Sequence, residues 1–310
     1  MKKTLVMFAA GMIPAVMAAA TVTLQPISPQ WKKTSDHSAS IDYKGNRVWP
    51  ALKLVPGEAL KPNTLYRITF EAKSSSPELI FCMFDSVLNG KKQGLYTTFF
   101  PTKDFKKYTC YFNSGETPAM GNPRIYFNPS KAFQMKVKDV KLDEMTGELL
   151  YGQNLLSWGD FENDNTFRPF AKDMKDRIKI DDSDVKSGKK SLLLDCVQGK
   201  KTMITSVLIP AIPGKEIEVK FFAKSADAAR IRVNFNWWAP GGKHCDKSFY
   251  FTLENEWKEY TLNFQVPEDV EKRPVLRRNL MSSFSIEGQC LTKDGDAKIY
   301  IDDISYKIKK

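Results

Sequence analysis

Two stretches of this chain repeat each other: TLYRITFEAKSSS at residues 64–76 and KEIEVKFFAKSAD at residues 215–227. Each stretch alternates apolar with polar residues and contains Ala-Lys-Ser near its end. Each also follows a turn that contains proline. Two more pairs recur in the same order: DFKKYTCYFNS (104–114) with EWKEYTLNFQV (256–266), and KVKDVKLDEM (136–145) with YIDDISYKIK (300–309). Three ordered matches at a similar spacing indicate a duplicated domain.

The repeated stretches have a hydrophobic period of two residues. Apolar side chains alternate with polar ones over residues 217–221, 231–235 and 260–266. This alternation is typical of half-buried strands, and turn sequences such as Pro-Gly, Ser-Gly and Gly-Gly separate the runs. Many short strands in about 140 residues predict an antiparallel β-sandwich of the jelly-roll type. We therefore expect an all-β chain of two tandem sandwiches.

The N-terminus has the pattern of a signal peptide. Lys2 and Lys3 precede an apolar run at residues 5–16, and Ala18-Ala19-Ala20 supplies a cleavage pattern before Thr21. We expect a signal peptide at 1–20, a first domain at 21–147 and a second at 150–310. The short linker, 146–153, predicts close neighbours. No later apolar run is long enough to span a membrane, so we expect a secreted, periplasmic or cell-surface protein.

The chain is basic, with 47 Lys and Arg against 36 Asp and Glu and a net charge of +11. Loss of Lys2 and Lys3 leaves +9. The basic residues are scattered among acids, which favours a solvated surface that keeps the protein soluble. The sharper alternative is attraction to acidic polymers such as uronate-containing or sulfated glycans. Export argues against nucleic acid as a partner, and no recognition motif for it is present.

Five cysteines in an exported chain indicate one or two disulfides and a leftover thiol. Cys82 and Cys110 both occupy expected core-facing strand positions. A Cys82–Cys110 bridge and two ordinary buried thiols are both consistent with that pattern. Cys245 with Cys290 is a weaker candidate pair. No Cys-x-x-Cys spacing indicates a metal site.

The second copy carries an ordered set of motifs. NLLSWGDFEN (154–163) opens it, VKSGKKSLLL (185–194) and PAIPGKEIEVKFFAKS (210–225) follow, and IYIDDIS (299–305) closes it. With EWKEYTLNFQVP between them, these motifs resemble carbohydrate-binding modules of the family 4/9 type. The resemblance implies a galactose-binding-like β-sandwich over residues 150–310. The first copy has only part of the pattern and lacks the Gly-Asp-Phe-Glu opening, so it resembles a diverged relative.

The resemblance also implies a structural Ca²⁺ that ties the opening segment to the last strand. The matching groups are Glu162, Asp302, Asp303 and backbone carbonyls around Lys186 to Lys189, with Asp160 and Asp184 in reserve. Ca²⁺ needs six to eight oxygen ligands. The alternative is that these acids cap turns and accept backbone N–H bonds. Since Lys138 replaces the first acid of the closing pair in the first copy, we expect no matching site there.

Sugar binding needs flat aromatic faces rimmed by polar groups, and the richest candidate is NFNWWAPGGKHCDKSFYF at residues 234–251. Val233 and Phe235 point inward in the expected strand, so their neighbours point outward. Adjacent tryptophans cannot easily both face inward, so one is accessible or partnered. The alternative is that both complete the core or the contact between modules. The expected carbohydrate-binding residues are Trp237, Trp238, Tyr250, Asn234, Asn236, Arg232 and His244.

Other aromatic residues are weaker candidates. The corresponding residues in the first module are Trp31, Trp49, Asp85 and Tyr96. We expect Trp158 to pack against its own sandwich. Trp257 is a poor candidate, because Phe105 has the same place in the first copy and the position begins a strand.

The sequence contains no recognised catalytic motif. His37 and His244 lie in different modules and outside triad or zinc spacing, and no G-x-S-x-G, phosphate loop or dinucleotide fingerprint is present. We expect a non-catalytic exported protein that binds a polysaccharide or cell-surface glycan by stacking and hydrogen bonding. The alternative is a structural or adhesion protein that contacts other envelope proteins. A glycan-processing enzyme is less favoured, because two binding-type sandwiches use up the chain and leave no room for a catalytic domain. Glycoside hydrolysis needs two carboxylates that face each other across a cleft, and sequence does not reveal such a pair.

Overall fold

The computed structural model describes most of the chain after the predicted signal peptide. The described ranges are 22–27, 29–44, 51–75, 80–88, 91–99, 101–114, 124–127, 132–162, 168–169, 172–206, 208–238, 244–268, 281–292 and 295–310. Residues 1–20 and Trp49 lie outside them, so the signal peptide stays a prediction.

Strands dominate the part of the chain that the structure describes. In the ranges given above, the helical elements are the short 3-10 turns η2 (Gly147–Leu149) and η3 (Lys172–Arg177). The all-β fold class is therefore confirmed. The described part of the chain has no helix of the length and hydrophobicity needed to cross a bilayer.

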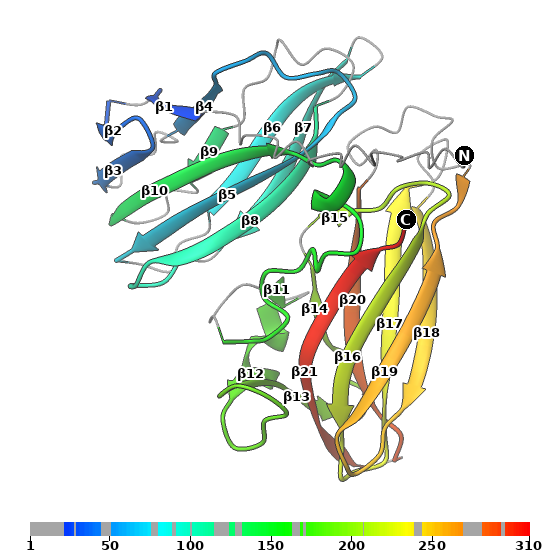
Figure 1. Ribbon diagram of the computed structural model, residues 1–310. Coiled ribbons are helices and arrows are strands. Elements are labelled where there is room, and N and C mark those ends of the chain that lie inside the picture. The colour runs from blue at the N-terminus through cyan, green and yellow to red at the C-terminus, as the bar shows by residue number, and fades with distance from the viewer. Residues whose placement is uncertain are drawn as a thin grey trace, which may run out of the picture.

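The first module is a sandwich of two five-stranded antiparallel sheets (Figure 1). One sheet has the order β1 (Val22–Pro26), β4 (Ala51–Pro56), β9 (Arg124–Phe127), β6 (Ile80–Leu88) and β7 (Lys91–Phe99). The other has the order β2 (Trp31–Ser35), β3 (Ser38–Tyr43), β10 (Phe133–Glu144), β5 (Leu65–Ser74) and β8 (Lys106–Asn113).

The second module is also a pair of antiparallel sheets. One has the order β11 (Arg168–Pro169), β14 (Thr202–Thr205), β20 (Met281–Cys290), β17 (Ala229–Trp238) and β18 (His244–Thr252), with β15 (Ile209–Pro210) also paired to β20. The other has the order β12 (Ile178–Asp181), β13 (Ser191–Val197), β21 (Asp296–Ile308), β16 (Glu216–Lys224) and β19 (Lys258–Gln265).

The two modules have the same strand order, position by position. The repeated stretches occupy matching places: β5 and β16 are fourth in their sheets, β8 and β19 fifth, and β10 and β21 third. The strands of the other sheets correspond in the same way, from β1 with β11 to β7 with β18. This is the arrangement that the sequence repeat predicts, although the domain limits 21–147 and 150–310 stay predictions.

The correspondence extends to an irregularity in the third strand. The ladder between β10 and β5 shifts between Lys138 and Lys141, and the ladder between β21 and β16 shifts at the equivalent level. Asp139 and Asp303 occupy these bulges with φ of 53° and 50°. Asp tolerates this left-handed region better than a β-branched residue, which explains an aspartate at both sites.

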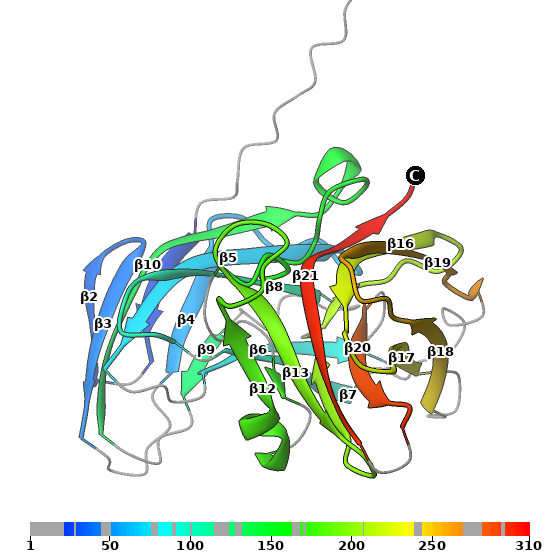
Figure 2. The ribbon, with the colours of Figure 1, turned by 90° about the horizontal axis from the view of Figure 1, so that it is seen from below.

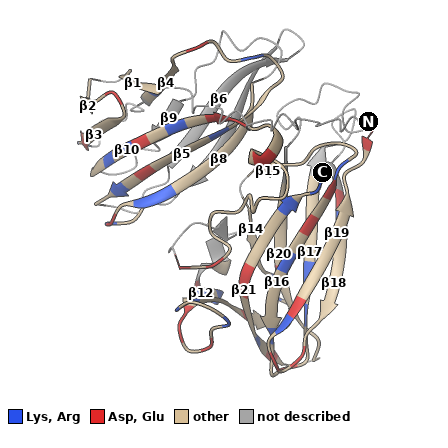
Figure 3. Cartoon of the chain, in the orientation of Figure 1, with Lys and Arg blue, Asp and Glu red and all other residues tan. Residues whose placement is uncertain are grey.

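The predicted alternation forms the cores. Ile217, Val219 and Phe221 of β16 are buried, and so are Ile231, Val233 and Phe235 of β17. Trp158 packs inside as expected: it is 3% exposed and its ring lies 6.2 Å from that of Phe284. Lysine, arginine and acidic residues are interspersed along the strands of both modules, as Figure 3 shows.

The modules contact each other, as the short linker predicts, and both views place them side by side (Figures 1 and 2). Tyr111 on β8 donates its hydroxyl hydrogen to the backbone oxygen of Leu155 at 3.0 Å. Leu65 and Tyr111 belong to the same buried cluster as Leu155 and Leu156. Burial raises the pKa of Tyr111 above its usual value, so the hydroxyl stays a donor.

The cysteine predictions have two outcomes. Cys110 is buried in β8, but the side chain of Cys82 is not described, so their bridge stays a prediction. The Cys245–Cys290 pair is wrong. These residues face Trp237 and Ala229 on β17, which are about 26 Å apart along the strand. A disulfide needs Cα atoms within about 7 Å.

Candidate functional site

The candidate site lies on the outward face of the sheet β11-β14-β20-β17-β18. Strand β17 is flanked by β20 on one side and β18 on the other. Its buried residues Ile231, Val233 and Phe235 fill the core, so Arg232, Asn234 and Asn236 belong to the other face. The structure therefore confirms the inward and outward alternation predicted for this strand.

Cross-strand register brings polar residues beside each of these three side chains. Arg232 lies between Tyr250 of β18 and Glu287 of β20. Asn234 lies between Ser248 and Ser285, and Asn236 between Asp246 and Ser283. Residues directly opposite in a ladder have Cβ atoms about 5 Å apart, so the three rows form one polar surface.

Tyr250 supplies an exposed aromatic ring to this surface. Its side chain is 53% exposed, among the few exposed large hydrophobic side chains in the described ranges. The Arg230 guanidinium carbon lies 4.9 Å from the ring centroid, which restrains the ring and keeps a positive charge beside it. An exposed aromatic face on a polar sheet is a surface on which a sugar ring can stack.

Arg232 and Glu287 form an ion pair that leaves hydrogen-bonding capacity unused. Arg232 Nη2 lies 2.7 Å from Glu287 Oε2, and both side chains are largely buried. Arg232 Nε has no hydrogen-bond partner within the described part of the protein, and Glu287 Oε2 meets Arg232 Nη2 as an ion pair without hydrogen-bond geometry. Buried polar atoms normally have hydrogen-bond partners, so Arg232 Nε is an unused donor and Glu287 Oε2 an acceptor with capacity left.

The neighbouring side chains are held in order by hydrogen bonds. Gln289 Nε2 donates to Glu287 Oε1 at 2.9 Å, and Arg230 Nε donates to Gln289 Oε1 at 2.7 Å. Ser248 Oγ donates to Asn234 Oδ1 at 3.2 Å, and Asn234 Nδ2 to Asn236 Oδ1 at 3.3 Å. These bonds orient the surface in advance of binding.

The structure brings Tyr250, Arg232, Asn234 and Asn236 together as predicted. Trp237, Trp238 and His244 lie in the same two strands, and Trp238 is opposite His244, but their side chains are not described. Sequence reasoning missed four contributors. The missed residues are Arg230, Ser248, Glu287 and Gln289. Arg230 had a signal in the sequence, its two-residue spacing from Arg232, whereas only strand pairing reveals the other three.

The first-module candidates are not assembled in this way. Trp31 is 3% exposed and belongs to the core, so its prediction as a sugar-stacking residue is wrong. Asp85 and Tyr96 lie in β6 and β7 with side chains that are not described, and Trp49 lies outside the described ranges.

The predicted calcium residues meet at one loop, residues 185–190. Glu162 Oε1 accepts the backbone N–H groups of Lys189 and Lys190 at 2.7 and 3.1 Å. Asp302 Oδ2 accepts those of Lys186 and Ser187 at 3.1 and 3.0 Å. Acids from the two ends of the module thus converge, as the resemblance implies.

The oxygens at this loop do not form a cation cage in the arrangement described. Both carboxylates receive backbone N–H donors, which is the alternative reading of these acids. Within the described ranges, no three His, Cys, Asp or Glu residues gather as metal ligands. Asp303 occupies the bulge with φ of 50°. The acids therefore act here as loop anchors, and calcium stays a prediction.

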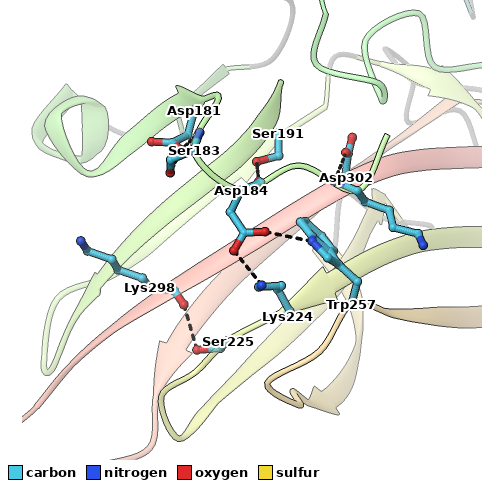
Figure 4. Close-up of polar contacts among 10 residues, drawn as sticks. Asp181, Ser183, Asp184, Ser191, Lys224, Ser225, Trp257, Lys298 and Asp302 are labelled. Carbon is cyan, nitrogen blue, oxygen red and sulfur yellow. Dashed lines mark hydrogen bonds and ion pairs between the residues drawn. The ribbon is translucent and has the colours of Figure 1, made fainter. Parts of the chain in front are cut away.

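Asp184 and Trp257 have structural roles at the edge of this loop (Figure 4). Trp257 Nε1 donates to Asp184 Oδ1 at 3.0 Å, and Lys224 Nζ lies 2.7 Å from Asp184 Oδ2. Ser191 Oγ donates to the backbone oxygen of Asp184 at 2.7 Å. Trp257 is therefore a packing residue, in agreement with its low rank as a sugar-binding candidate.

Comparison with known proteins gives no family assignment. The chain matches no protein-family model, and it matches no curated protein. It is similar to the CBM22-1–CBM22-2 tandem domain of Paenibacillus barcinonensis Xyn10C, with 14% identity, 92% of this chain and 91% of that chain covered, and a TM-score of 0.38.

Two other solved structures match about half of the chain. A family 4 carbohydrate-binding module ("CBM4 structure and function") has 16% identity over 49% of this chain and 99% of its own, with a TM-score of 0.35. The arabinose-bound α-L-arabinofuranosidase MgGH51 has 14% identity over 52% of this chain and 27% of its own, with a TM-score of 0.38. All three scores are below 0.5, so these likenesses assign neither a ligand nor an activity.

Proposed function

We propose that the chain is an exported, non-catalytic glycan-binding protein, and that its second module binds sugar on the outward face of β17, β18 and β20. The observation that carries this proposal is the exposed Tyr250 ring beside the buried, incompletely bonded Arg232–Glu287 pair. The motif resemblance to family 4/9 modules supports the same class of ligand. Export rests on the predicted signal peptide.

The mechanism follows from the geometry of the face. A pyranose ring stacks on Tyr250, whose other contacts leave half of the side chain exposed. Its hydroxyls bond Arg232 and Glu287, which supply a donor and an acceptor close to the ring. Asn236 extends the polar row along β17 for the next sugar unit. Such a face favours polymers over free monosaccharides, because adjacent contacts add.

The test is affinity gel electrophoresis of the chain without residues 1–20, against a panel of neutral polysaccharides. We expect at least one polymer to retard the chain. Tyr250→Ala should bind about tenfold more weakly, a loss of roughly 1.4 kcal/mol, because it removes the stacking surface. Tyr300→Ala is the matched control, because Tyr300 is a half-buried tyrosine of the opposite sheet. Equal loss in both variants contradicts the assigned face.

The same material separates the alternative functions. Binding to no glycan together with recovery of a stable envelope protein supports the adhesion function instead. Release of reducing ends from a bound polysaccharide overturns the non-catalytic part of the proposal. Trp237→Ala and Trp238→Ala test the two remaining aromatic candidates, whose side chains are not described.

A further inference from the structure

A cleft of about 520 Å³ opens on the outward face of the sheet β2-β3-β10-β5-β8 in the first module. It lies over β2, β3, β10 and β5, far in sequence from the Tyr250 face. Four lysines and one acid contribute the charges of its lining: Lys32, Lys73, Lys103, Lys136 and Asp42. Figure 3 shows Lys and Arg bands on β10 and β5, interspersed with acidic ones.

Three of the lysines form one row across the sheet. Lys32 is opposite Ser40, Ser40 is opposite Lys136, and Lys136 is opposite Lys73. The Lys136–Lys73 pair puts two like charges on directly facing positions, with Cβ atoms about 5 Å apart. Facing like charges destabilise a ladder unless a counter-charge lies between them.

The same sheet neutralises its next lysine. Lys138 is opposite Glu71, and its ammonium lies 2.9 Å from Glu71 Oε2 and 3.3 Å from Asp139 Oδ2. The acid in the lining of the cleft, Asp42, already has a partner, because its Oδ2 lies 2.7 Å from Lys44 Nζ. Within the described ranges, Lys32, Lys136 and Lys73 have no acidic partner of their own.

The second module provides an internal comparison. Lys224 has the place of Lys73 in the repeated Ala-Lys-Ser, and each lies over an aromatic ring, Trp257 or Phe105, at 5.8 or 4.8 Å. Lys224, however, forms an ion pair with Asp184 at 2.7 Å and faces Tyr300 across the ladder rather than a lysine. Only the first module thus leaves this position facing a like charge in the described structure.

We propose that the lysine cleft binds an anionic saccharide, a sugar unit that carries a carboxylate or a sulfate. The charge of the ligand follows from the uncompensated lysine row. Its saccharide class rests on the proposed function, and hydroxyl and amide groups of Ser40, Ser75 and Gln134 in the lining suit sugar hydroxyls. The cleft lies in the size range of small-ligand sites.

The experiment compares charged polymers with their uncharged forms: polygalacturonate with its methyl ester, and dextran sulfate with dextran. The full chain without residues 1–20 should bind at least one charged form and not its uncharged counterpart. Lys73→Gln/Lys136→Gln should weaken that binding at least tenfold and flatten its salt dependence. The control Lys179→Gln/Lys200→Gln removes the same charge from exposed sites of the second module and should leave binding unchanged.

A second variant separates binding from folding. Lys136→Glu puts an opposite charge across from Lys73, so the melting temperature should hold or rise while binding of the charged polymer is lost. Equal weakening by the cleft and control pairs overturns the proposal in favour of general charge attraction. Equally tight binding of inorganic polyphosphate overturns the saccharide assignment.

Failure here is distinguishable from failure of the proposed function. Tyr250→Ala should weaken neutral glycans and spare the charged polymer, which supports two separate sites. Retention of neutral glycans with no binding of either charged polymer overturns the anionic site alone.

Discussion

Asp302 shows how one side chain can fix a loop to the last strand of the second module. It is 0% exposed and accepts three backbone N–H groups, from Lys186, Ser187 and Asp303. Asp302→Ala removes these acceptors, and we expect a loss of about 1–3 kcal/mol in the free energy of unfolding. Urea denaturation measures it. Asp296→Ala, at an exposed position of the same strand, is the control, and equal midpoints for both variants contradict the anchoring role.

Two cysteines differ in their predicted reactivity. Burial raises the pKa of the Cys196 thiol to about 12, because a thiolate is disfavoured in the core. Cys290 is only partly buried, with its sulfur 3.0 Å from Thr292 Oγ1. At pH 8 iodoacetamide should modify Cys290 and spare Cys196 until urea unfolds the chain; peptide mass mapping reads this out. The Cys196 thiol ionises at a lower pH in the unfolded chain than in the folded one. The free energy of unfolding should therefore fall as the pH rises above about 9.

At the scale of elements, the bulge in β10 and β21 is the shared irregularity of the two modules. Asp139 and Asp303 hold left-handed φ values there. We expect Asp303→Val to lower the free energy of unfolding by about 1–2 kcal/mol, and Asp303→Gly to be nearly neutral, because a β-branched residue is strained in this region and glycine is not. Asp139→Val should cost a similar amount in the first module. Equal midpoints for the Val and Gly variants contradict the backbone explanation.

The loop at residues 185–190 is the element on which the calcium prediction depends. If the ion binds there, EDTA should lower the melting temperature of the full chain, and Glu162→Ala should abolish the effect of EDTA as well as loosen the loop. Without the ion, Glu162→Ala should lower the melting temperature by itself, because Lys189 and Lys190 lose their acceptor. Differential scanning fluorimetry with and without Ca²⁺ distinguishes the two outcomes.

The strands were predictable from the sequence, whereas the pairing of each strand with its neighbours in the sheet was not. A period of two residues identifies β16, β17 and β19 and their buried faces, because alternation is a local property. Glu287 reaches Arg232 only through the register of β20 on β17, and that register is set by long-range pairing. Trp31 was misjudged for the same reason: one position along a strand decides between the core and the solvent.

At the scale of the whole molecule, the buried contact of Tyr111 with Leu155 couples the two sandwiches. Since Leu65 and Tyr111 share a core cluster with the second module, we expect the full chain to unfold in a single calorimetric transition rather than two. Tyr111→Ala removes a buried ring and leaves the Leu155 oxygen without that donor, so it should split the transition or broaden it. Tyr108→Ala is the contrasting variant.

Tyr108 is equally buried but belongs to the core of the first module alone. Tyr108→Ala should destabilise the first module. Because the contact between Tyr111 and Leu155 is intact in this variant, the second module should unfold together with the first, in one transition at a lower temperature. A cavity of this kind costs about 3–5 kcal/mol. Two resolved transitions in the unmodified chain would show that the modules unfold independently, and the rigid spacing between the Tyr250 face and the lysine cleft would then have no basis. A single transition that Tyr111→Ala splits supports a fixed spacing, which lets two weak sites engage one polymer.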